Sequence, residues 1–138
     1  MRQSGVRTIW AGAITLSAAA LLTISCSGIV DPSKNQMETF SGTVKAQGFD
    51  THTFTVNNTG EISIKITAMA PLDNVPLGVI WGQASSAGTC VSTIQSAVAN
   101  LNIPAISSQI YSGAYCVVVY DLGILSADET YSVLVSHP

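Results

Sequence analysis

The sequence predicts an all-β protein, a small antiparallel β-sandwich preceded by an N-terminal signal helix. Three observations predict it. Three segments after residue 37, at residues 51–56, 61–68 and 131–136, alternate apolar and polar residues with the period of two that is typical of strands. Turn-forming residues interrupt these runs about every ten residues. No strand–helix–strand alternation appears, as parallel sheets would require. With 138 residues, the chain is long enough for one domain.

Residues 1–25 are predicted to form a secretory signal peptide. Arg2 and Arg7 supply the positive start, an uncharged and largely apolar stretch follows over residues 8–24, and small residues come next. The alternative is a retained transmembrane helix, because the uncharged run over residues 8–30 is long enough to cross a bilayer. Serine, threonine and glycine dilute this run, which favours cleavage.

The end of the apolar stretch reads Leu22-Thr23-Ile24-Ser25-Cys26. It resembles the lipobox of bacterial lipoproteins, in which a small residue precedes the cysteine that becomes the first mature residue and carries lipid such as palmitate. Thr23 stands where the lipobox has leucine. The resemblance implies a lipid on Cys26 and a membrane-anchored protein of the bacterial cell envelope, facing the periplasm or the exterior. The alternative is ordinary cleavage near Ala20 or Ser25, which leaves Cys26 as a free thiol.

Residues 26–37 are rich in polar and turn-forming residues and are predicted to be a flexible tether to a domain over residues 38–138. If Cys26 carries lipid, Cys90 and Cys116 remain as a pair, and we expect them to form a disulfide. Two separate buried thiols are the alternative. No metal site is expected at these cysteines, because neither has a CxxC neighbour or a nearby histidine.

The strands are predicted in order along the chain. A first strand is expected near residues 38–47. Residues 51–56 and 61–68 both alternate, and Asn57-Asn58-Thr59-Gly60 between them predicts a β-hairpin. A short apolar run predicts a strand at residues 77–81, and another short strand is expected at residues 106–111.

Residues 115–120 are apolar on both faces, as in a central sandwich strand, and alternation over residues 131–136 predicts the last strand. The stretch 83–107 is ambiguous. Ile94, Ala97, Val98 and Leu101 have helical spacing, but a long loop followed by the strand at 106–111 is favoured.

The span from residue 38 to residue 136 resembles the bacterial pre-peptidase C-terminal (PPC-like) domain. The matching segments are Phe54-Thr55-Val56, residues 62–66, residues 113–119 and residues 130–135. The resemblance implies a jelly-roll-like sandwich that accompanies secreted hydrolases as an accessory module. No hydrolase is attached here, and residues 83–107 have no clear match.

The charge distribution bears on partners. Without Arg2 and Arg7, three basic residues remain against eight acidic ones, a net charge of −5, and no basic cluster exists. Nucleic acid is therefore not an expected partner, because phosphate binding needs clustered lysine and arginine.

Neither catalysis nor a cofactor is predicted. The chain has two histidines: His52 is interpreted as structural, and His137 is expected to fray near the terminus. A hydrolase with an unrecognised site is the remaining catalytic alternative. Calcium could be held by clustered carboxylates, but Asp121, Asp128 and Glu129 are interpreted as a solvated turn.

The predicted function is that of a membrane-anchored, exported lipoprotein with a non-catalytic binding or accessory module. Its ligand is an unidentified protein or glycan. The alternative is a module that binds carbohydrate or another small ligand through exposed aromatic side chains. The candidates are Trp81, Tyr111, Tyr115, Tyr120 and Tyr131, of which Trp81 and Tyr115 are expected to pack in the core instead.

Overall fold

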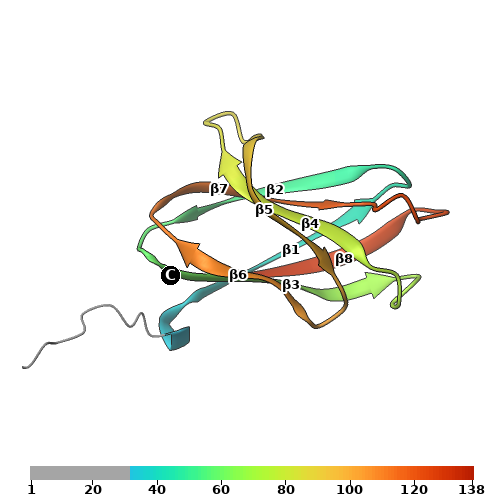
Figure 1. Ribbon diagram of the computed structural model, residues 1–138, viewed down its shortest axis with the longest axis horizontal. Coiled ribbons are helices and arrows are strands. Elements are labelled where there is room, and N and C mark those ends of the chain that lie inside the picture. Colours follow the sequence, from blue (N-terminus) through green and yellow to red (C-terminus); the bar gives the residue numbers. More distant parts are fainter. Residues whose placement is uncertain (1–31) are drawn as a thin grey trace, which may run out of the picture.

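The computed structural model describes residues 32–138, which form two four-stranded antiparallel sheets packed face to face (Figure 1). A short 3-10 helix, η1 (Pro32–Lys34), precedes them. The strands are β1 (Gln36–Val44), β2 (Phe49–Val56), β3 (Gly60–Ala70), β4 (Leu77–Ala84), β5 (Cys90–Ala99), β6 (Pro104–Ile110), β7 (Gly113–Tyr120) and β8 (Glu129–His137). The predicted all-β sandwich is confirmed.

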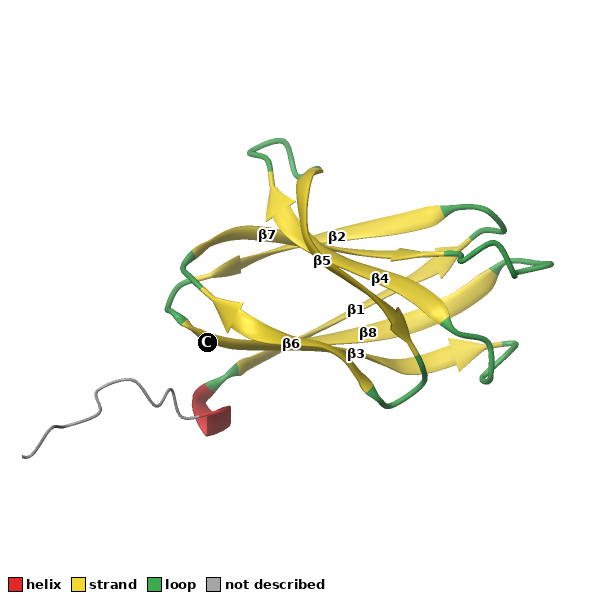
Figure 2. Ribbon diagram, in the orientation of Figure 1, coloured by secondary structure: helices red, strands yellow, loops and turns green. Residues whose placement is uncertain are grey.

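The strand order is β1-β8-β3-β6 in one sheet, called sheet A, and β2-β7-β4-β5 in the other, sheet B. Eight strands arranged in this order form a jelly roll. Among strands that follow each other in sequence, only β4 and β5 pair with one another, and every other connection crosses between the sheets (Figure 2).

The core lies between the sheets and is built by alternation. Every second residue of β3 faces inward, so Ile62, Ile64 and Ile66 are fully buried, and Val117 and Val119 of β7 meet them from sheet B. All eight strands and the core they share lie within residues 36–137. The segment Ser27–Pro138 therefore contains the whole sandwich, and it is suitable for measurements of binding and stability.

The predicted hairpin of residues 51–56 and 61–68 is wrong. Both strands exist, but β2 pairs with β7 in sheet B, whereas β3 pairs with β8 and β6 in sheet A. The turn residues 57–59 lead the chain from one sheet to the other. A polar turn is compatible with a crossover between sheets as well as with a hairpin. The inward residues of β2 and β3 enter the same core, but they do so from opposite sheets.

The predicted loop over residues 83–107 is also wrong, and so is its helical alternative. Residues 90–99 form β5, an edge strand paired with β4. Register shifts in this pairing break the period of two, and most β5 side chains are exposed, so the sequence lacks the alternation of a half-buried strand. The strand predicted at residues 106–111 is β6.

The remaining strand predictions hold, and β7 is central, as expected from its apolar faces. The sandwich begins at Gln36, within the predicted tether. The predicted leader and Cys26 lie outside the described residues. Within residues 32–138, no helix is long and apolar enough to cross a membrane.

The C-terminus is not frayed, contrary to the prediction for His137. Gln36 pairs with His137, so the two ends of the sandwich chain lie together (Figure 1). The His137 ring is fully buried, packs 5.3 Å from the Phe54 ring, and its Nε2 lies 2.8 Å from Glu38 Oε1. Strand pairing along all of β8 holds the terminus in place.

Candidate functional site

The outer face of sheet B is the most distinctive surface of the domain. Its side chains alternate with the core residues of the same strands, so they point away from sheet A. None is ionisable at neutral pH, and we call this surface the uncharged face. Its members are Phe49, Thr51, Thr53, Thr55, Gly78, Ile80, Gly82, Ser96, Val98, Ala114, Cys116, Val118 and Tyr120.

One row of the uncharged face is apolar across all four strands. Strand register aligns Phe49, Tyr120, Gly78 and Val98 in that order. Phe49 is 72% exposed and Val98 is 57% exposed, while Tyr120 is half-buried. We call this the aromatic row. It lies at the end of sheet B farthest from Gln36, because Phe49 begins β2 directly after the β1–β2 turn.

Tyr120 lies across the strand beside it because that strand has glycine at position 78. A Cβ atom built on Gly78 would overlap three atoms of the Tyr120 ring. The ring therefore rests on the backbone of β4 instead of standing out from the sheet. A ring supported in this way presents an aromatic surface to solvent in a fixed orientation.

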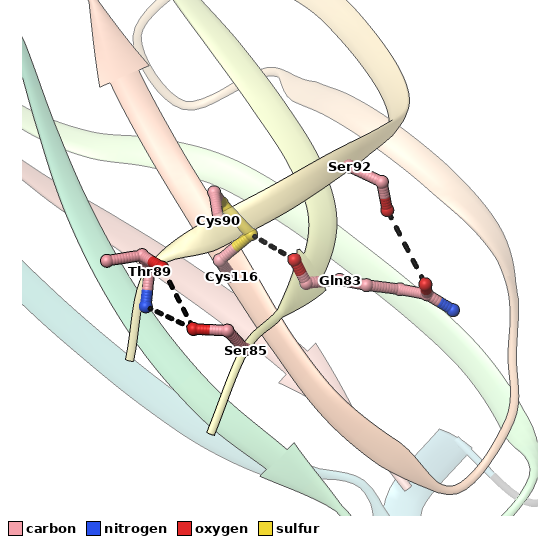
Figure 3. The surroundings of a disulfide bond; sticks show 6 residues. All are labelled: Gln83, Ser85, Thr89, Cys90, Ser92 and Cys116. Carbon is pink, nitrogen blue, oxygen red and sulfur yellow. Dashed lines mark hydrogen bonds between the residues drawn. A yellow bond between two sulfur atoms is a disulfide. The ribbon is translucent and has the colours of Figure 1, made fainter. Parts of the chain in front are cut away.

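The other end of the uncharged face is closed by a disulfide between Cys90 of β5 and Cys116 of β7 (Figure 3). These strands flank β4, so the start of β5 crosses the outside of β4. A side chain at Gly82 would overlap the Ser92 carbonyl, and the Cys116 sulfur lies 3.4 Å from the Gln83 carbonyl oxygen. Glycine in β4 thus permits the crossing that the disulfide fixes.

The β4–β5 connection next to the disulfide is held by its own hydroxyls. Ser85 Oγ lies 2.8 Å from Thr89 Oγ1 and accepts the Thr89 N–H at 3.3 Å (Figure 3). Gly88 has φ of +78°, a left-handed conformation that suits glycine.

The five candidate aromatic residues separate into two groups. Trp81, Tyr115 and Tyr131 are buried between the sheets, which confirms the expected core packing of Trp81 and Tyr115. Tyr120 lies on the uncharged face, and Tyr111 is 60% exposed in the β6–β7 turn. Only the last two can offer a ring to a ligand, and Phe49, which sequence reasoning did not single out, joins Tyr120.

His52 belongs to a partly buried polar cluster at the β1–β2 edge. Its Nε2 lies 2.7 Å from the Tyr131 hydroxyl, which donates to Asp50 Oδ2 at 3.0 Å. Phe40 stacks on the imidazole with ring centroids 5.1 Å apart. Burial, followed by the hydrogen bond to Asp50 and the charge of Asp50, raises the pKa of Tyr131 far above its ordinary value of 10.0. Tyr131 is therefore a neutral donor.

This cluster lacks the arrangement of a hydrolase triad. A triad histidine needs a serine or cysteine on one nitrogen and a carboxylate on the other. Within residues 32–138, the polar side chains that contact His52 are Tyr131 and Asp50, and both face the same nitrogen. The cluster joins sheet B to sheet A.

Backbone amides hold the Asp121 carboxylate. Its carboxylate accepts the Gln47 N–H at 2.8 Å, and those of Gly123, Ile124 and Leu125 at 2.9, 3.0 and 3.1 Å. These bonds connect the β1–β2 turn to the β7–β8 loop. The Gln47 N–H, with the other three, holds the pKa of Asp121 below its ordinary value of 3.8 against the opposing effect of desolvation.

We expect Asp121 to make the stability of the domain acid-sensitive. Because its folded-state pKa is lowered, its contribution is fully present above pH 3.8 and is lost as the pH falls through the folded-state value. Urea unfolding at stepped pH should show that Asp121→Asn is less stable than the wild type at pH 7 and that the difference shrinks below pH 3.8. A difference that stays constant across this range would contradict the predicted role of the Asp121 carboxylate.

The solvated acidic turn predicted around residues 121–129 is wrong for two of its three members. Glu129 is buried, and its Oε1 accepts the Leu72 N–H at 3.0 Å, while Asp121 is bound as described. In the part of the chain that the structure describes, no group of three or more histidine, cysteine or acidic side chains could hold a metal ion.

The outer face of sheet A carries a shallow hollow of about 420 Å³. Its walls are mostly small side chains, such as Ser41, Thr43, Ala68 and Ser132. The one aromatic residue that contributes to it, Tyr131, is buried with its hydroxyl bonded to Asp50. The hollow therefore offers no aromatic surface comparable with the aromatic row.

The sequence matches no protein-family model and no curated protein sequence. The fold resembles the crystal structure of a mitogen derived from Yersinia pseudotuberculosis, with a TM-score of 0.55, 15% identity, and coverage of 75% of this chain and 87% of that chain. A periplasmic inhibitor of g-type lysozyme from Aeromonas hydrophila gives a TM-score of 0.49 and 13% identity, over 79% and 92% of the two chains. At such identities, the similarity to the mitogen shows the fold alone.

Proposed function

We propose that the chain is an exported, lipid-anchored and non-catalytic binding module, and that it meets its ligand with the uncharged face. The single observation that carries the proposal is a complete sheet face without charge, on which Phe49 and Val98 are largely exposed. Exposed apolar side chains that gather on one face of a soluble domain mark an interaction surface.

The position of the aromatic row supports a lipid anchor at the opposite end of the sandwich, where the chain enters it. The chain enters the sandwich at Gln36, which pairs with His137 near the end of β8, whereas Phe49 lies at the opposite end of the strands. A lipid on Cys26 would hold the entry end toward a membrane and leave the aromatic row on the far side. Stable anchoring needs more than one acyl chain, as the lipobox resemblance implies.

The accessory role suggested by the resemblance to the pre-peptidase C-terminal domain stays a prediction. We propose it only in the sense of a module without a reaction of its own. The surroundings of His52 support this proposal, because its polar side-chain contacts within residues 32–138 are to Tyr131 and Asp50 and not to a serine or cysteine.

Anchoring is tested by the intact mass of the product in bacterial membrane fractions. We expect a mass that begins at Cys26 and includes acyl chains, and a Cys26→Ser variant should leave the membrane fraction. A full-length, unmodified product, or a Cys26→Ser variant that stays in the membrane, would overturn the lipid anchor.

The binding face is tested by co-sedimentation of Ser27–Pro138, which lacks the lipid site, with isolated bacterial envelopes. Thr53→Lys places a charge on the uncharged face, and Thr39→Lys is its matched control, since both are exposed threonines on edge strands. We expect Thr53→Lys to lower retention by about tenfold and Thr39→Lys to leave it unchanged. Equal retention of the two variants would refute the proposed face.

A further inference from the structure

We propose that the ligand of the uncharged face is a neutral carbohydrate chain that stacks on Tyr120 and Phe49. This inference rests on the proposed function and adds the ligand class. It starts from the charge distribution. Residues 74–120, which contain all of β4, β5, β6 and β7, include no aspartate, glutamate, lysine, arginine or histidine. The outward side chains of β2 add only Phe49 and threonines.

Absence of charge over a whole face selects against charged ligands. A phosphate, a uronic acid or an acidic peptide would lose hydration on this face without gaining an opposite charge. The domain does place ionisable groups elsewhere, such as Glu61 and Lys65 on the outer side of β3. The ligand that matches the uncharged face is therefore itself uncharged.

The aromatic row supplies flat apolar surface in a fixed place. Tyr120 rests on the Gly78 backbone, and Phe49 is its register partner on the next strand. Adjacent strands lie about 4.8 Å apart, so the row extends roughly 14 Å across the four strands. A short run of sugar rings fits this length, and the C–H face of a sugar packs against an aromatic ring.

Hydroxyl groups border the aromatic row. Thr51, Thr53 and Thr55 follow Phe49 on the same face of β2, and Ser96 precedes Val98 on the same face of β5. A hydroxyl both donates and accepts a hydrogen bond, as the hydroxyls of a neutral sugar do. An apolar protein partner would find these hydroxyls unmatched, whereas a glycan pairs with them and still uses the rings.

The test is affinity electrophoresis of Ser27–Pro138 in gels with soluble polysaccharides. The neutral probes are a β-1,4-glucan derivative without charge, xylan and galactomannan, and the acidic probes are polygalacturonate and alginate. We expect at least one neutral probe to slow migration and neither acidic probe to do so. Tyr120→Ala should weaken binding by about tenfold. Tyr120→Phe should bind as tightly as the wild type, because the ring remains.

Tyr111→Ala is the matched control, because Tyr111 is an exposed tyrosine in the β6–β7 turn and outside the uncharged face. It should bind as the wild type does, and circular dichroism should show that every variant folds. Failure of all neutral probes, or equal loss in Tyr120→Ala and Tyr111→Ala, would overturn the inference. If Thr53→Lys still lowers envelope retention in that case, the binding face stands and its ligand is a protein or lipid.

Discussion

Replacing Trp81 with alanine is expected to lower the free energy of unfolding by about 3–5 kcal/mol. Trp81 is 2% exposed, lies on the inner side of β4, and packs against Tyr115 with ring centroids 5.8 Å apart. Its removal leaves a large cavity in a core that the two sheets share. Urea unfolding of Ser27–Pro138, followed by far-ultraviolet circular dichroism, measures the loss.

Two variants make this prediction specific. The Trp81 indole N–H is buried and has no hydrogen-bond partner within residues 32–138, so Trp81→Phe removes an unpaired donor while keeping a ring, and it should cost less than alanine. Tyr120→Ala removes a ring from the outer face and should also cost less. Equal unfolding midpoints for Trp81→Ala and the wild type would show that Trp81 is not part of the core.

Loss of the disulfide is expected to lower the free energy of unfolding by about 3–4 kcal/mol. Cys90 and Cys116 are 26 residues apart in sequence, and the bond restricts the unfolded chain over that loop. The bond also joins the start of β5 to β7, although β4 lies between these two strands in sheet B. Urea unfolding with and without dithiothreitol should show the difference.

The double variant Cys90→Ser, Cys116→Ser separates the bond from other effects of the reductant. It should unfold at the same urea concentration whether dithiothreitol is present or absent, and close to the reduced wild type. If the oxidised and reduced wild-type segments unfolded at the same urea concentration, the disulfide would contribute nothing to stability.

Strands with one face on the core could be predicted from the sequence, because burial on one side produces alternation. Ile62, Ile64 and Ile66 are the clearest case, and all three are fully buried. Strand partners could not be predicted in this way. The turn residues 57–59 are compatible both with a hairpin in one sheet and with a crossover to the other sheet. The pairing of β2 with β7 and of β3 with β8 determines that the chain crosses over.

The elements that sequence reasoning missed depend on distant contacts. β5 is an edge strand whose exposed side chains need not alternate. The role of Asp121 depends on Gln47, which is 74 positions away, and the burial of His137 depends on Glu38, 99 positions away. For the candidate site, sequence reasoning correctly placed Trp81 and Tyr115 in the core. The position of the Tyr120 ring follows from a glycine on another strand.

The place of β8 affects how the polypeptide can reach its final form. The last strand lies between β1 and β3, so sheet A cannot close before the nine residues of β8 are available. Contacts between such distant segments slow folding to milliseconds or longer. A chain threaded through a membrane pore from its N-terminus would therefore emerge with β1 still unpaired. Sheet A would close only after β8 had passed through.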